Sequence, residues 1–214
     1  MTKEEMIHEL DAYINHIIFA SDCLAAYTSI LDSCRKHNTE INLACGFFTI
    51  TKYSLSKCLC IELSKLFVGS GDEKNMFKLI NNVRSNQQLF PKQLKTTYQY
   101  ADDPNCPEDV LVEAIDLEND IAQAEIQLAR LKPIIDNLKG RRDKFLVHND
   151  PEYFDGTCNP VWDFPLSMSD VQALIDFSAE FCNMLLSYLT GRVVFCQSTN
   201  AGDLEILLQK IKST

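Results

Sequence analysis

The stretch LARLKPIIDNLKGRRDKFLVHND, residues 128–150, decides how this chain is expected to fold. Its apolar residues recur every three or four positions, which is the spacing of one face of an α-helix. On an ideal helix with about 100° per residue, Leu131, Leu138 and Leu146 lie within about 60° of Arg142. Arg142 therefore belongs to the apolar face, where a guanidinium has to be paired or has to line a cleft or an interface.

His148 lies six residues after Arg142, near the end of the same helical pattern. It is turned about 120° from Arg142 on an ideal helix, so unwinding or a second copy of the chain is needed to bring both onto one phosphate. An imidazole titrates near neutral pH, and together with a guanidinium it can cleave RNA without a metal. The alternative is a structural ion pair at Arg142 and a C-terminal cap at His148, which the helix dipole favours.

The rest of the chain repeats the helical periodicity. Thr2 and Glu5 predict a capping box that opens the first helix, which should end near Arg35. The second helix, residues 40–68, is apolar on nearly every side, as expected for the centre of a bundle. Further helices are predicted over residues 72–86, 91–100, 108–147, 169–190 and 202–211. We expect an all-α, up-and-down four-helix bundle with short accessory helices, formed by residues 1–214 as one domain.

The composition and charge of the chain limit the functions that it can have. The chain has 214 residues, of which 46% are hydrophobic and 23% are charged. It is therefore long and apolar enough to bury a core. The formal net charge of −10 opposes general attraction to nucleic acid or anionic lipid, so RNA has to be contacted through a local basic patch. Six basic residues within fifteen positions offer such a patch or simply a solvated helix face: Arg130, Lys132, Lys139, Arg141, Arg142 and Lys144.

Nine cysteines are scattered along the chain without a CxxC pair. This distribution favours buried free thiols in a reducing cytoplasm and predicts neither a zinc site nor another metal or cofactor. The N-terminal segment has no secretory pattern and apolar runs are short, so we expect no membrane span.

Glu62 falls on the apolar face of the second predicted helix. A carboxylate at such a position is costly unless it is paired. We expect it either to meet Arg142 across the core or to be satisfied by Lys65, one turn further along the helix. A pair with Arg142 would favour a structural role for that arginine.

Two segments carry a resemblance to a known family. RRDKFLVHND, residues 141–150, resembles the motif of the HEPN superfamily: an arginine, a polar residue, several more residues and a histidine. FFTITKYSLSKCLCIELSKLF, residues 47–67, with the Gly-rich stop and short helix that follow, resembles the abortive-infection AbiU-type branch. The similarity covers residues 47–83 and 128–150.

This resemblance implies a helical bundle that forms a homodimer, with the motifs of two subunits facing each other. Many HEPN proteins are metal-independent ribonucleases in phage defence or toxin–antitoxin systems, and others keep the fold as a binding module. By transfer, His148 would be the general acid and base and Arg142 would stabilise the phosphate. The RNA's own 2′-hydroxyl would attack, leaving a cyclic phosphate, and Asp143 would orient a motif residue.

The neighbours of these residues complete the expected site. We expect Arg141, Lys144 and Asn149 to bind the RNA substrate. The commonest form of the family has asparagine where this chain has Asp143, and an ionised aspartate repels phosphate. The alternative function is therefore a non-catalytic helical module that binds a protein partner or acts as an antitoxin.

Overall fold

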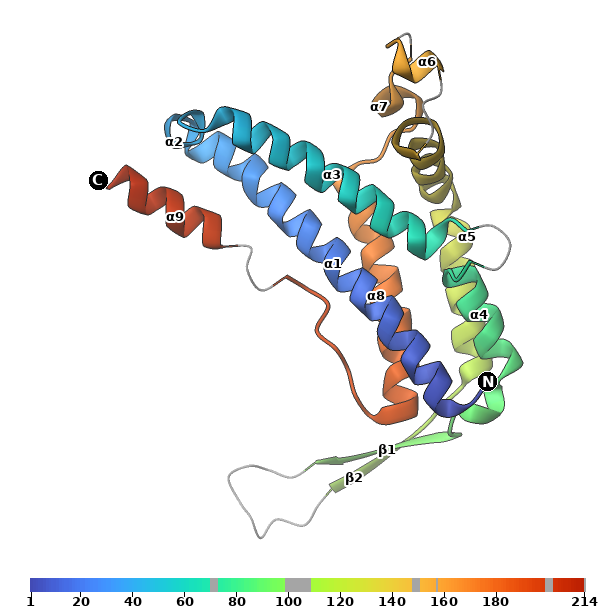
Figure 1. Cartoon of the computed structure of the whole chain (residues 1–214). Helices are drawn as coiled ribbons and strands as arrows, with labels where there is room; N and C mark the ends of the chain where they lie inside the picture. Colours follow the sequence, from blue (N-terminus) through green and yellow to red (C-terminus); the bar gives the residue numbers. More distant parts are fainter. Residues whose placement is uncertain (70–72, 99–108, 148–150, 157, 199–201, 214) are drawn as a thin grey trace.

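A computed structural model describes residues 1–69, 73–98, 109–147, 151–156, 158–198 and 202–213. The fold is all-α, as predicted, with one small β-ribbon among the described residues (Figure 1). In chain order the elements are α1 (Lys3–Lys36), α2 (Asn38–Asn42), α3 (Cys45–Phe67), α4 (Met76–Ser85), η1 (Gln87–Leu89), β1 (Gln93–Tyr98), β2 (Asp109–Ala114), α5 (Leu117–Arg141), η2 (Arg142–Val147), α6 (Pro151–Phe154), α7 (Pro160–Asp163), α8 (Met168–Thr190) and α9 (Asp203–Lys212).

The helices α1, α3, α5 and α8 form the bundle, and α4 packs beside α5 (Figure 1). Apolar side chains from these helices meet in one continuous core. Those that are completely or almost completely buried include Met6, Leu10, Ile17, Leu63, Leu66, Leu79, Ile121, Leu138, Leu174, Leu185 and Leu186. Removal of this apolar surface from water is the main stabilising contribution to the bundle.

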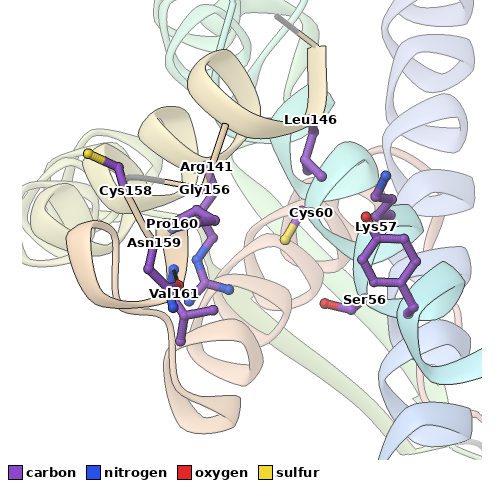
Figure 2. A pocket seen from close by; sticks show the side chains of 11 residues that line it. Ser56, Lys57, Cys60, Arg141, Leu146, Gly156, Cys158, Asn159, Pro160 and Val161 are labelled. Atoms are coloured by element: carbon purple, nitrogen blue, oxygen red, sulfur yellow. Dashed lines mark hydrogen bonds between the residues drawn. The ribbon is translucent and has the colours of Figure 1, made fainter. Parts of the chain in front are cut away.

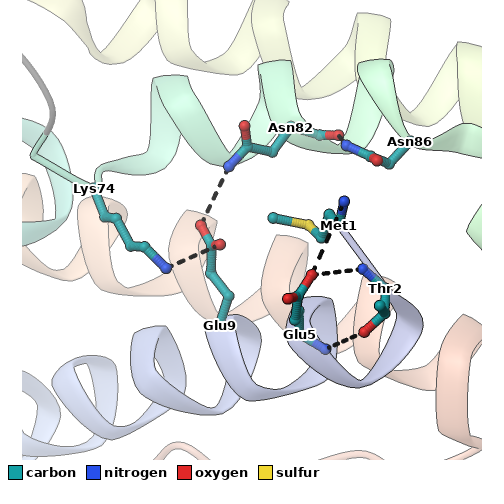
Figure 3. Close-up of polar contacts among 7 residues, drawn as sticks. All are labelled: Met1, Thr2, Glu5, Glu9, Lys74, Asn82 and Asn86. Carbon is teal, nitrogen blue, oxygen red and sulfur yellow. Dashed lines mark hydrogen bonds and ion pairs between the residues drawn. The ribbon is translucent and has the colours of Figure 1, made fainter.

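The ends of two helices follow the sequence closely. Thr2 accepts a hydrogen bond from the backbone of Glu5, whose side chain accepts one from the backbone of Thr2 at 2.7 Å, so the predicted capping box is confirmed (Figure 3). Gly191 ends α8 in the left-handed conformation, with φ of 71°. The lack of a Cβ removes the steric cost of that conformation.

A buried carboxylate ties α4 to α1. Glu9 is 4% exposed, and its two oxygens accept hydrogen bonds from Lys74 at 3.1 Å and from Asn82 at 3.4 Å (Figure 3). Lys74 precedes α4 and Asn82 lies within it. The pairing satisfies an acid that would otherwise be costly to bury and holds α4 in place beside the bundle.

The second helix differs from the prediction in two ways. It is divided into α2 and α3 by a turn at Leu43 and Ala44, close to Gly46, a residue of low helix propensity. Its first half is also not central, because Phe47 and Ile50 are about two-thirds exposed. Figure 1 shows the reason: the beginning of α3 and the end of α1 run together past the other bundle helices.

The helix predicted over residues 91–100 and the first turns of the helix predicted over residues 108–147 are wrong. Gln93–Tyr98 forms β1 instead of the helix expected over residues 91–100, and Asp109–Ala114 forms β2 instead of the first turns of the long helix. The strands pair antiparallel, with Gln93 opposite Ala114. Valines at positions 110 and 112 favour a strand, and α5 begins only after Asp116, whose side chain caps it.

The helix that carries the motif also changes its geometry. The regular α5 ends at Arg141, and Arg142–Val147 continues as the π-helix η2 rather than as a further α-helical turn. The short helices α6 and α7 lie between the helices predicted over residues 108–147 and 169–190, where no helix is predicted.

By length and composition, α1 could cross a bilayer, as core helices of soluble bundles also could. In this fold it packs along α3 and α8. The expectation that the chain has no membrane span remains a prediction.

Candidate functional site

Arg142 stands at the first position of η2 and lines a pocket of about 250 Å³ between α3, the segment before α4 and the motif helix. The described residues that line it are Ile61, Ser64, Lys65, Val68, Glu73, Lys74 and Arg142. Three of them are cations and one is an acid. The sequence left open whether Arg142 is paired or lines a cleft or an interface, and the structure shows it paired with Asp143 and at a pocket.

The guanidinium of Arg142 is held by two neighbours. Its Nε and Nη2 atoms lie 2.6 Å from Oδ1 of Asp143, and Nη1 donates to the backbone oxygen of Val68 at 2.9 Å. The side chains of Arg142 and Asp143 are 26% and 33% exposed. Asp143 therefore neutralises the charge that the motif offers to a phosphate, while the end of α3 fixes its position.

The winding of the motif helix determines the directions in which the motif side chains point. A π-helix is wound more loosely than an α-helix, and such segments occur often at functional sites. Here it begins at Arg142 and runs to Val147, immediately before the motif histidine. The helix is thus wound more loosely between the two motif positions, while His148 and Asn149 themselves lie outside the described residues.

Arg141 faces a second and different pocket (Figure 2). Its Nε donates to the backbone oxygen of Phe164 at 2.6 Å, which ties the end of α5 to the segment after α7. It also lies against the thiol of Cys60: burial raises the pKa of Cys60, and the charge and hydrogen bond of Arg141 oppose that rise. The two adjacent arginines therefore do not share one pocket. Lys144 is exposed on η2.

The predicted meeting of Glu62 and Arg142 is wrong. Glu62 accepts from Lys65 at 2.6 Å and lies 2.8 Å from Nδ1 of His16, so the local alternative through Lys65 is confirmed. Burial alone would raise the pKa of Glu62, but the bonds from Lys65 and His16 outweigh burial and lower it. Arg142 therefore pairs with Asp143 rather than with an acid across the core.

The sequence prediction missed the residues around Arg141. Tyr53, Ser56, Lys57 and Cys60 all line its pocket and stand at positions i, i+3, i+4 and i+7 of α3. That spacing places them on one helical face, and this pattern in the sequence indicates that they share a surface. Among the described residues, no three or more His, Cys, Asp or Glu side chains gather as metal ligands would.

An all-α helical bundle is the fold that the resemblance to HEPN proteins implies. The family model AbiU2, which is of HEPN type, matches residues 3–207. The chain therefore belongs to the AbiU2 family of HEPN proteins, which associates it with abortive infection. No curated protein and no solved structure matched the chain.

Proposed function

We propose that this protein is a metal-independent endoribonuclease of the HEPN type that acts in phage defence or in a toxin–antitoxin system in the cytoplasm. The observation that carries the proposal is the position of Arg142, half-buried in a cation-lined pocket at the point where the motif helix unwinds. Phosphate is the natural ligand of such a guanidinium. Family membership is consistent with this chemistry.

The proposed mechanism uses the side chains of the motif. His148 removes the proton of the RNA 2′-hydroxyl and returns a proton to the leaving 5′-oxygen, while Arg142 stabilises the charge that accumulates on the phosphate. The products are a cyclic phosphate and a free 5′-hydroxyl. Asp143 holds Arg142 until the phosphate competes for it, and Arg141, Lys144 and Asn149 contact the flanking RNA.

Cleavage of random-sequence RNA oligonucleotides in EDTA tests the proposal. The wild type should cleave and leave cyclic phosphate ends, whereas His148→Ala and Arg142→Ala should each lose at least about 100-fold in rate. His8→Ala and Arg35→Ala are matched controls, because both replace exposed side chains on α1, outside the motif pocket. Equal cleavage by wild type and His148→Ala would remove the enzymatic function.

A second candidate is a non-catalytic module that binds a protein partner or serves as an antitoxin. The ion pair between Arg142 and Asp143 favours it, since a neutralised arginine binds phosphate more weakly. A folded wild type that cleaves none of the RNA oligonucleotides would support this second function.

We also propose a homodimer and place its interface on α3 rather than on the helix that carries the motif. Phe47, Ile50, Ser54, Cys58 and Ile61 lie within about 80° on an ideal helix. All five are exposed. Ile61 also lines the Arg142 pocket, so a second copy on this stripe would lie next to the motif. Exposed apolar stripes of this kind favour association.

A further inference from the structure

The pocket that holds Arg141 is separate from the Arg142 pocket and has the size of a ligand site. Its volume is about 470 Å³. Small-molecule sites occupy about 300–1000 Å³, so this pocket falls within their range. It lies between α3, the motif helix and the segment that ends in α7 (Figure 2). The described residues that line it are Tyr53, Ser56, Lys57, Cys60, Arg141, Leu146, Gly156, Cys158, Asn159, Pro160 and Val161.

The charged side chains in the described part of this lining favour an anion. Arg141 and Lys57 are cations, and none of the described lining residues is Asp or Glu, although the chain as a whole carries −10. Within the described part of the chain, Arg141 forms no ion pair with a carboxylate, in contrast to Arg142. Its Nε donates a hydrogen bond to the backbone oxygen of Phe164, which holds the guanidinium in place.

The guanidinium has further N–H donors beyond Nε. Figure 2 shows it extending between Val161 and the side chains of Ser56 and Cys60. The Ser56 hydroxyl and the Asn159 amide add neutral polar groups to the same lining. A phosphate placed at Arg141 would therefore have both charge and hydrogen bonds available.

The remaining wall suits a flat apolar group. Tyr53 and Val161 are 54% and 59% exposed, and Leu146 and Pro160 complete this wall. The ammonium of Lys57 lies over the Tyr53 ring, 4.5 Å from its centre, so a positive charge and an aromatic group adjoin in the same lining. A ligand with a planar ring and a phosphate matches this combination, because nucleobases stack on aromatic side chains.

We propose that this pocket binds one nucleoside monophosphate unit, with its phosphate on Arg141 and Lys57 and its base against Tyr53 and Val161. The binding does not depend on cleavage at Arg142. Two sources can supply the unit: a free nucleotide or the 5′-phosphorylated end of an RNA.

Isothermal titration of the full chain with AMP, GMP, CMP and UMP tests this site. At least one of the four should bind, and inorganic phosphate and the matching nucleoside should each bind at least tenfold more weakly. Arg141→Gln removes the charge, and Val161→Phe fills the pocket from an exposed position that does not belong to the core. Both variants should weaken nucleotide binding at least tenfold, while Arg35→Gln at an exposed position near the end of α1 should bind like the wild type. Circular dichroism verifies that each variant is folded.

The possible results separate clearly. No binding of any of the four nucleotides at millimolar concentration, or undiminished binding by folded Arg141→Gln and Val161→Phe, would overturn the proposal. Inorganic phosphate binding as tightly as the nucleotide would overturn the nucleotide assignment, because the apolar wall would then contribute nothing. Competition by a 5′-phosphorylated dinucleotide would identify RNA ends as a source, and its failure beside a binding mononucleotide would identify the free nucleotide.

Discussion

The Arg142–Asp143 ion pair is the residue-scale feature that governs the proposed chemistry. Asp143 holds two nitrogens of the guanidinium, and the backbone of Val68 holds a third. A phosphate has to displace the carboxylate before it gains the full charge of Arg142. The pair therefore positions the arginine and reduces its affinity for RNA at the same time.

Replacing Asp143 with asparagine should raise the rate of RNA cleavage. The change keeps the shape of the side chain but removes the charge that competes with phosphate, a contribution of about 1 kcal/mol for a partly exposed pair. That energy corresponds to about a fivefold rise in kcat/KM, measured on labelled RNA oligonucleotides. Asp136→Asn is the matched control, because it removes the same charge from an exposed pair with Lys132 on α5. A rise of similar size in the control would assign the effect to net charge instead.

Glu62 predicts a defined pH dependence of stability. Its pKa in the folded chain lies below the usual value of 4.5, so the ionised form stabilises the fold. The stabilisation is complete above about pH 4.5 and is lost as the pH falls through the lowered pKa. Glu62→Gln should therefore be less stable than the wild type by about 1–2 kcal/mol at pH 7, with the difference shrinking below pH 4.5. Urea unfolding across pH 3–7 measures this, with exposed Glu180→Gln as the control; a difference independent of pH would contradict it.

At the scale of elements, the sequence predicts long periodic helices well and short irregular segments poorly. The first helix and the helix ending at Gly191 were predicted because a capping box and a glycine stop mark their ends. The strands over residues 93–98 and 109–114 lie where the sequence predicts helix, because short runs carry too little periodicity to separate the two. The π-helix at Arg142 could not be predicted from the apolar periodicity, because Leu146 also falls on the apolar face of an ideal α-helix.

The candidate site, like the fold, could be predicted only in part from the sequence. The position of Arg142 on the apolar face followed from periodicity, whereas its partner did not, because the choice between Glu62 and Asp143 depends on how α3 and α5 pack. The Arg141 pocket escaped prediction because α7 closes it, and no local pattern places that segment against α3.

Gly140 is the contact through which this segment docks on the motif helix. A Cβ at residue 140 would lie 2.2 Å from Cδ1 of Phe164, so the ring rests directly on the glycine. Alanine normally stabilises a helix by about 1 kcal/mol relative to glycine. Gly140→Ala should instead lower stability by about 1–3 kcal/mol, because the Phe164 ring and α7 have to move.

Thermal and urea unfolding measure this effect. Gly46→Ala provides the matched control: it also lies in a helix, but nothing comes within 4 Å of the added Cβ, so it should be neutral or stabilising. If Gly140→Ala proved as stable as Gly46→Ala, the docking of Phe164 on α5 would be wrong.

At the scale of the whole molecule, the acidic charge and the exposed α3 stripe act in opposite directions. A net charge of −10 keeps copies apart over most of the surface, so association has to occur where charge is sparse. The stripe through Phe47, Ile50 and Ile61 offers apolar area without acidic residues at its exposed positions. Salt screens the repulsion between copies and leaves apolar contacts in place, so the proposed dimer should strengthen as salt rises.

Ile50→Lys should convert the proposed dimer into a monomer. Ile50 lies in the middle of the stripe and is 67% exposed, so lysine costs little in the single chain but would bury an unpaired charge in the interface. Light scattering behind size exclusion measures the mass, and Ile126→Lys on α5, at a residue 46% exposed, is the control that should remain dimeric. If Ile126→Lys alone dissociated the dimer, the interface would belong to the motif helix instead. If the wild type stays monomeric at high salt and at concentrations well above micromolar, the dimer proposal is wrong. The Arg142 pocket then has to act within a single chain.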